Sequence, residues 1–435
     1  MSVSAISGPR PLPERVDVFI AGAGTAGAAA AGSAAALGLR VLCVDRALLD
    51  SSGAFWLNGV SREAFARADV ALPEGDELRG SDSAFHMIAG YGPERLLVRD
   101  HGVLDVDMRL LVQRLQARAR DAGATLEGVV EVRGIDGDRV LTSRGTVRAD
   151  VIVDASGLTG ARLLGQPRTP ARDLCAAAQA VYEVDDAAGA SAFLERHGAA
   201  EGEPLCFTGV SGGYSILNVR VHHGQVAILT GSIPADGHLA GRPMIERFVR
   251  DEAWIGRLVS GGRRAIPLGR PHDVLARGRI AAIGDAARQV FSAHGSGIGA
   301  GMEAGHLLAQ TIAAGRSPND YAADWMRRRG ALFAGYDLFR RFSQGLDLSS
   351  LRKLMGAGLI DPESAAAALG QRFPRVSPLR ALEMGPALGR LGPLLPGLAR
   401  LGARMAALGA LYRAYPRDPT SRRAWARRVQ RVCGA

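Results

Sequence analysis

The chain has 435 residues, of which 47% are hydrophobic and 22% are charged, a composition typical of soluble globular proteins with two or three domains. Its formal net charge of +10 comes from arginine, because Lys353 is the only lysine. Aromatic residues make up only 5% and form no array with basic residues, so the charge does not indicate nucleic-acid binding. The single lysine excludes any mechanism that needs a catalytic lysine elsewhere in the chain.

The N-terminal residues and the cysteines indicate a compartment. The first fifteen residues are rich in proline and contain no apolar signal core, so we expect no export. The four cysteines lie far apart, a spacing that predicts neither a metal knuckle nor a disulfide framework. Together these features predict a cytoplasmic protein.

The first segment with an informative pattern runs from residue 16 to residue 46. A strand-like run, Val16–Ala21, leads into Gly22-Ala23-Gly24-Thr25-Ala26-Gly27, and an Ala-rich helix and a second strand ending in Asp45 follow. The glycines allow a tight turn and close approach of a pyrophosphate, while the terminal acid can accept hydrogen bonds from a ribose. We therefore predict a dinucleotide site made of Gly22, Gly24, Thr25, Ala26, Gly27, Asp45 and Arg46. A membrane helix over 18–39 is disfavoured, because glycine is a poor helix former.

Two later segments repeat the arrangement of a small turn and an acid after a buried strand. Asp154-Ala155-Ser156-Gly157 follows the strand-like run 147–154, and Gly284-Asp285 follows the run 279–283. A glycine-rich loop then leads through Gly297 and Ile298 into a helix predicted over 301–314. Ligands bind at the carboxyl ends of strands in open α/β sheets, so we predict cofactor contacts from Asp154, Gly157, Gly284, Asp285, Gly297 and Ile298.

The order of these patterns predicts an α/β chain in four parts. Residues 1–169 and 271–320 carry the nucleotide-binding patterns. Residues 170–270 contain alternating, β-branched runs typical of an antiparallel sheet, which we interpret as a substrate-binding domain. Residues 321–435 have helical patterns.

Taken together, the three segments resemble the superfamily of FAD-dependent enzymes that joins group A flavoprotein monooxygenases with geranylgeranyl-reductase-type flavoenzymes. The resemblance covers roughly residues 14–315. It implies a Rossmann-like FAD-binding domain of the glutathione-reductase type with an inserted antiparallel-sheet domain. It also implies that Arg109 reaches the FAD, that Asp285 binds the ribityl chain, and that NAD(P)H docks only transiently, without a domain of its own.

The resemblance implies more than one reaction. The loop 289–299 looks more like the reductase branch, although Ser292 stands where the family usually has proline and Arg288 where hydroxylases often have histidine. We place an NAD(P)H-driven monooxygenase of biosynthetic metabolism first, acting on a hydrophobic small molecule, and a double-bond reductase or dehydrogenase second. A flavin-dependent halogenase is a remote alternative, because halogenases need a lysine in the N-terminal half. A non-catalytic lipid-escort protein is equally remote.

Four residues are candidates for the catalytic pocket. They are Trp56 and Asn58 after the second strand, Tyr214 on the middle sheet, and His294 in the glycine-rich loop. Each has an ordinary alternative. Trp56 could be a packing aromatic, Asn58 a turn former, Tyr214 a strand residue and His294 a structural loop histidine.

Two further features concern possible partners. His222 and His223 precede Gly224, and with no further ligand evident in the sequence the pair indicates a turn and not a metal site. The C-terminal arginines around Trp425 have two interpretations, a contact with a membrane surface for a lipid-like or carrier-bound substrate, or the solvated face of a helical cap. These arginines are Arg422, Arg423, Arg427, Arg428 and Arg431.

Overall fold

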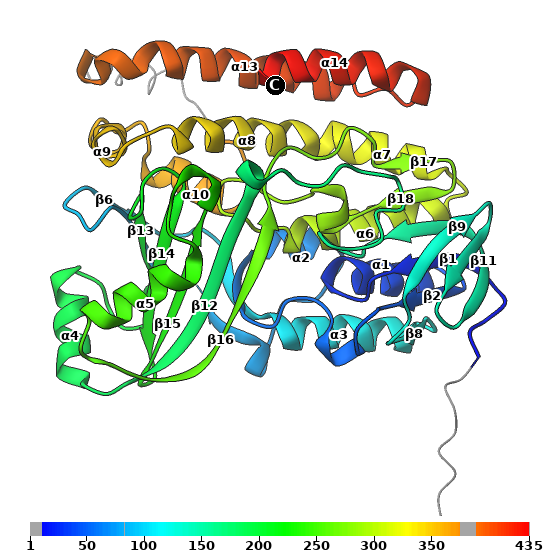
Figure 1. Cartoon of the computed structure of the whole chain (residues 1–435), viewed down its shortest axis with the longest axis horizontal. Coiled ribbons are helices and arrows are strands. Elements are labelled where there is room, and N and C mark those ends of the chain that lie inside the picture. The colour runs from blue at the N-terminus through cyan, green and yellow to red at the C-terminus, as the bar shows by residue number, and fades with distance from the viewer. Residues whose placement is uncertain (1–10, 82, 375–388, 435) are drawn as a thin grey trace, which may run out of the picture.

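The computed structural model describes residues 11–81, 83–374 and 389–434. It contains a mainly parallel sheet, a seven-stranded mixed sheet beside it, and layers of C-terminal helices above both (Figure 1). A small third sheet is formed by β3 (Leu57–Ser61), β7 (Val103–Asp107) and β4 (Leu78–Ser81). The predicted α/β class is confirmed.

The parallel sheet supports the nucleotide-binding segments. Its order is β17 (Ala276–Arg277), β18 (Ile280–Ala282), β11 (Gly145–Asp154), β1 (Arg15–Ala21), β2 (Val41–Val44) and β8 (Thr125–Glu127). All neighbours are parallel except β17 with β18. Val18 and Ile20 of β1 belong to the core beneath the helices, whereas Phe19 and Ala21 belong to the core on the opposite face. A strand buried on both faces reads as a continuous apolar run.

Helices and a hairpin cover the two faces of this sheet. One face carries α1 (Thr25–Ala36), packed between α3 (Met108–Asp121) and α6 (Ile298–Ala313). The other face is covered by β9 (Val132–Asp136) and β10 (Arg139–Thr142). The helix predicted over 301–314 thus starts three residues earlier, directly after Gly297.

The mixed sheet differs from the predicted substrate domain at one edge. Its order is β16 (Ile255–Pro267), β12 (Leu174–Val184), β15 (Gln225–Ser232), β14 (Ser215–His222), β13 (Leu205–Thr208), β5 (Phe85–Ala89) and β6 (Arg95–Val98). Residues 85–98, which we assigned to the first domain, therefore complete this sheet, with β5 parallel to β13. The sequence does not reveal such a pairing, because the partner strand is more than a hundred residues away. Helices α4 (Ala187–Arg196) and α5 (Gly241–Asp251) lie on its outer side (Figure 1).

The C-terminal region is helical, as predicted, and forms two layers. The lower layer holds α7 (Pro318–Trp325), α8 (Ala331–Gln344), α9 (Leu348–Gly356) and α10 (Pro362–Leu369), and α2 (Arg62–Arg67) packs on α6 below it. Above lie α13 (Leu395–Arg413) and α14 (Arg422–Cys433) (Figure 1). Residues 375–388 of the region that we predicted to be helical are outside the described residues. In the described part, one stretch, Leu391–Arg413, is long and apolar enough to cross a membrane, and 6% of its apolar 18-residue window is buried.

Candidate active site

The glycine turn after β1 is closely packed. Gly22 has a φ of +107°, and a Cβ there would lie 2.3 Å from the carbonyl oxygen of Ala155. A Cβ on Gly27 would lie 1.8 Å from the carbonyl oxygen of Gly22. Gly24, in contrast, faces only Gly53, whose Cα would be 3.2 Å away. Gly24 and Thr25 begin α1 without a side-chain cap, which leaves the first amides of the helix available to an anion.

Asp45 holds this turn from the end of β2. One carboxylate oxygen accepts a hydrogen bond of 2.8 Å from the amide of Ala23, and the other accepts one of 2.9 Å from the amide of Ala47. The neighbouring Arg46 is exposed and donates to the side-chain and backbone oxygens of Thr159. The predicted acid is therefore at the turn, where its remaining lone pairs are available to a ribose.

The second segment requires a correction. The Asp154 side chain is fully buried, and it accepts hydrogen bonds from Ser156 and from the amide of Leu163 at 2.7 Å. Its carboxylate therefore shapes the loop after β11 and is not accessible to a cofactor, contrary to our prediction. Gly157 has a φ of +79° in the same loop, and a Cβ there would meet no described atom within 4 Å.

The third segment places an accessible acid against the glycine-rich loop, and we call the surface around Asp285 and Gly297 the recess. Asp285 is solvent-accessible, yet surrounding protein raises the pKa of its carboxyl, an effect that the charge of Arg264 opposes. A Cβ on Gly297 would lie 3.1 Å from Oδ1 of Asp285, so the glycine-rich loop and the Asp285 turn are in contact. Ile298 then begins α6. An accessible acid enclosed by glycine backbone is suited to bind the hydroxyl groups of a ligand.

Buried hydrogen bonds fix this recess. The side chain of Gln289 accepts from the amide of Gly284 at 2.7 Å and donates to the hydroxyl of Tyr321 at 3.0 Å. Ser292, where the family usually has proline, accepts a hydrogen bond of 3.0 Å from the amide of Gly269. The serine therefore ties the loop to the end of β16 through its hydroxyl group.

The three segments meet where β1, β11 and β18 end. Gly22 abuts Ala155 of the second segment, and a Cβ on Gly284 would lie 3.0 Å from the Cβ of Ala26 in the first turn of α1. Residues far apart in sequence thus come together at the carboxyl ends of the strands, the position at which ligands bind in open α/β sheets. The accessible Asp285 and the uncapped start of α1 fit the ribityl chain and pyrophosphate of FAD. Arg109 is exposed in the first turn of α3.

Two of the four pocket candidates share one apolar cluster between the sheets. Trp56 packs against a buried group that contains Tyr214, Leu268 and Val290. Burial strongly raises the pKa of the Tyr214 hydroxyl, which therefore stays protonated. Because Val290 belongs to the segment between Asp285 and the glycine loop, this cluster adjoins the cofactor recess.

The other two candidates lie outside the cluster. His294 packs against Phe291 with ring centroids 4.9 Å apart and faces the backbone of Ala368 in α10. Burial lowers its pKa to about 4, and its Nε2 has no hydrogen-bond partner among the described residues. Asn58 is not a turn former, because it lies in β3 opposite Val106 of β7.

Arg264 and Gln179 were not predicted from the sequence. Arg264, on β16, donates to the carbonyl oxygen of Gly53 and lies 5.4 Å from the ring centroid of Phe55. The amide of Gln179, on β12, bonds both backbone groups of Leu57. Both side chains reach from the mixed sheet to the loop that carries Trp56. No sequence motif distinguishes them, because their role depends on how the two sheets are placed.

Comparison with known proteins shows which fold the chain has. No protein-family model matches the chain. A digeranylgeranylglycerophospholipid reductase of Sulfolobus acidocaldarius is 25% identical over 453 residues, which cover 96% of this chain and 97% of that protein. A crystal structure of a geranylgeranyl bacteriochlorophyll reductase-like protein from Thermoplasma acidophilum superimposes with a TM-score of 0.71 at 17% identity, covering 89% of this chain and 99% of that one.

The chain has the fold of the FAD-dependent oxidoreductase superfamily. The resemblance found in the sequence is thereby confirmed. A further relative, a menaquinone reductase of Mycolicibacterium smegmatis, is 30% identical over 148 residues, which cover 33% of this chain and 36% of that protein. These relatives support FAD as the cofactor and an oxidoreductase activity.

Proposed function

We propose that the protein is an FAD-dependent oxidoreductase that acts on a hydrophobic small molecule and takes its electrons from NAD(P)H. The observation that carries the proposal is the apolar cluster of Trp56 and Tyr214 beside the recess of Asp285. In this arrangement a polar surface that suits a cofactor lies next to an apolar cluster that suits a hydrophobic substrate.

Different residues would bind the cofactor and the substrate. The glycine turn and the first amides of α1 bind the pyrophosphate, and Asp285 accepts hydrogen bonds from the ribityl chain. Trp56 and Tyr214 provide apolar surface that orients the substrate and excludes water. The flavin supplies the transfer of electrons, and the protein supplies position and a dry environment.

The proposal covers two reactions. Oxygen insertion, which the sequence placed first, is supported by the enclosed apolar cluster, since a monooxygenase must keep water from its reactive centre. Reduction of a carbon–carbon double bond is supported by the reductase relative that matches 96% of the chain. Both use the same cofactor and the same pocket, so the products distinguish them.

The deciding experiment measures which atoms, hydrogen or oxygen, are added to the substrate. The purified protein, reconstituted with FAD, is incubated with NADPH and an isoprenoid alcohol such as geranylgeraniol, once without oxygen and once under ¹⁸O₂. A product that gains two hydrogens without oxygen indicates the reductase, and a product that gains one ¹⁸O atom indicates the monooxygenase. Failure to bind FAD after reconstitution contradicts the proposal as a whole.

We also propose a peripheral contact with anionic membranes through α14. Arg423, Arg427, Arg428 and Arg431 are exposed there, next to the apolar α13. Two residues of the predicted basic face do not belong to it. Arg422 is buried and bonds Ala276 and Asn319, and the Trp425 ring is buried with its indole nitrogen bonded to Leu411. Sedimentation with anionic vesicles, and its loss when Arg427 and Arg428 are changed to Gln, tests this contact.

A further inference from the structure

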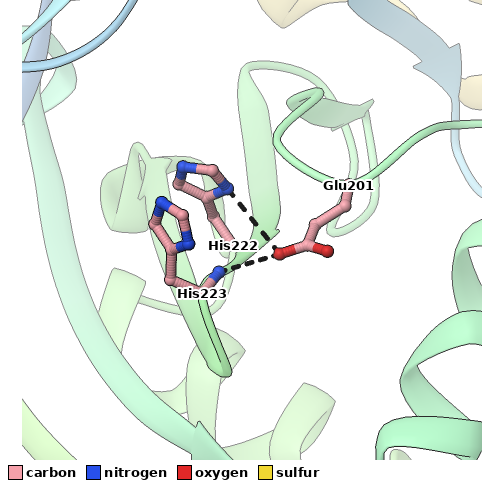
Figure 2. A group of neighbouring side chains, drawn as sticks. All are labelled: Glu201, His222 and His223. Carbon is pink, nitrogen blue, oxygen red and sulfur yellow. Dashed lines mark hydrogen bonds and ion pairs between the residues drawn. The ribbon is translucent and has the colours of Figure 1, made fainter.

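Three side chains with metal-binding atoms meet at the surface of the mixed sheet. Glu201 comes from the segment before β13, and His222 and His223 come from the end of β14 (Figure 2). One ligand atom of each residue lies within 4.8 Å of the other two. The sequence predicted no metal site at this histidine pair, because Glu201 is more than twenty residues away.

The two histidines are held side by side by the hairpin. β14 and β15 are joined by His223 and Gly224, whose φ angles are +50° and +67°. Two consecutive positive φ angles are typical of a tight type I′ turn, and His223 is an uncommon residue at the first position. The turn brings the imidazole rings to a centroid distance of 3.7 Å with 38° between their planes.

Glu201 is held by the backbone around it. The amide of Gly202 donates to the carbonyl oxygen of Val221 at 2.8 Å, and the carbonyl oxygen of Gly202 accepts a bond of 2.9 Å from Nε of Arg220. The Glu201 carboxylate in turn accepts a bond of 2.8 Å from the amide of His223. The acid is thus attached to the same hairpin as the two histidines, and little rearrangement is needed to use all three together.

One nitrogen in the cluster lacks a partner. Nδ1 of His222 is buried and makes no hydrogen bond within the described residues. It lies 3.7 Å from Oε1 of Glu201, too far for a hydrogen bond. Two metal–ligand bonds of roughly 2.0–2.2 Å can span such a separation when they meet at an obtuse angle.

We propose that Glu201, His222 and His223 bind one divalent transition-metal ion of the Zn²⁺ class, with water completing its coordination. Imidazole together with a carboxylate suits zinc and similar ions, whereas Mg²⁺ prefers oxygen ligands alone. The ion would clamp the segment before β13 to the β14–β15 hairpin. This site is separate from the proposed flavin site, because Tyr214 precedes β14 and His222 ends it, about 25 Å away along an eight-residue strand.

The test measures metal binding directly. Protein treated with a chelator and then freed of it is titrated with ZnCl₂, and bound zinc is measured by equilibrium dialysis and elemental analysis. The variants are Glu201→Gln, His222→Gln and His223→Asn, the last because asparagine tolerates the turn. The controls are Glu195→Gln, an exposed acid on α4, and His238→Gln, a histidine outside the cluster.

We expect one zinc per chain in the wild type and in both controls. Each cluster variant should bind zinc at least about tenfold more weakly than the wild type. Mutation of a residue that only hydrogen-bonds a metal ligand already weakens metal binding by about that factor. Zinc should also raise the thermal midpoint of the wild type and leave that of the cluster variants unchanged. Unchanged binding in all three cluster variants, or no saturable binding by the wild type, would overturn the proposal. Neither result bears on FAD binding, which the flavin content of the same samples reports independently.

Discussion

Asp285 is the accessible acid in the recess where the three cofactor segments meet. Its replacement by alanine should weaken FAD binding, because an acceptor for the ribityl hydroxyls is removed. A hydrogen bond to a charged group contributes about 1.5–3 kcal/mol, which corresponds to a tenfold to hundredfold rise in the Kd. The flavin-to-protein ratio after purification and the Kd from fluorescence quenching check this.

Two matched variants serve as controls for the measurement of FAD binding. Asp285→Asn keeps one acceptor oxygen and should recover part of the affinity. Asp76→Ala removes an exposed acid on the surface and should bind FAD like the wild type. Full flavin occupancy in Asp285→Ala would remove Asp285 from the site.

His294 makes stability depend on pH. Burial lowers its pKa from 6.5 to about 4, so the unfolded chain binds the proton at a higher pH than the folded chain. The free energy of unfolding therefore falls as the pH drops from about 6.5 to about 4, by up to about 3 kcal/mol for this residue. We expect the free energy of unfolding, measured by urea titration, to fall less between pH 7 and pH 5 for His294→Gln than for the wild type. Equal losses would show that the ring is not held neutral by the fold.

At the scale of elements, α1 and α6 approach so closely that side chains are excluded between them. A Cβ on Gly305 would lie 2.9 Å from the carbonyl oxygen of Ala26 and 3.0 Å from the backbone nitrogen of Ala30. Both helices begin at the proposed cofactor site. Their spacing therefore fixes the distance between the pyrophosphate side and the Asp285 side of the recess.

Gly305→Ala should lower the stability of the chain. The added methyl group meets backbone atoms, and overpacking of this kind costs about 1–3 kcal/mol. Gly402→Ala is the matched control, because this interior glycine of α13 has no described atom within 4 Å and alanine is the better helix former by about 1 kcal/mol. Urea midpoints should move in opposite directions for the two variants. A Gly305→Ala midpoint at or above that of the wild type would contradict the close packing.

At the scale of the whole molecule, a buried arginine joins the C-terminal helices to the mixed sheet. Arg340 of α8 pairs with Asp173 beside β12 at 2.9 Å and with Asp337 at 2.5 Å, and its side chain is fully buried. Arg340→Leu would leave Asp173 buried without this partner, which costs about 3–5 kcal/mol. We expect a correspondingly lower urea midpoint and looser attachment of α8.

The control is an arginine on the surface. Arg242→Leu removes an exposed pair with Glu246 one turn along α5, and exposed pairs contribute at most about 1 kcal/mol. Hydrogen exchange in α8 and the start of β12 reports the attachment directly. If both variants have the same stability, Arg340 does not join the two parts.

Much of the cofactor domain was determined by the sequence alone. Apolar strands, glycines with required backbone angles and acids at strand ends are local signals, because a turn such as that of Gly22 depends on neighbouring residues. The antiparallel runs predicted within residues 170–270 form β12, β14 and β15 for the same reason. The FAD-type fold that these signals implied was confirmed.

Only the tertiary structure decided the contacts between segments that are distant in the chain. It placed β5 beside β13, buried the Asp154 carboxylate beneath its own loop, and turned His294 toward α10. It also brought Glu201 to His222 and His223, and Arg264 to the Asp285 recess. Such pairings depend on how sheets and helices pack against each other, whereas a linear pattern specifies the type and face of an element but not its neighbour.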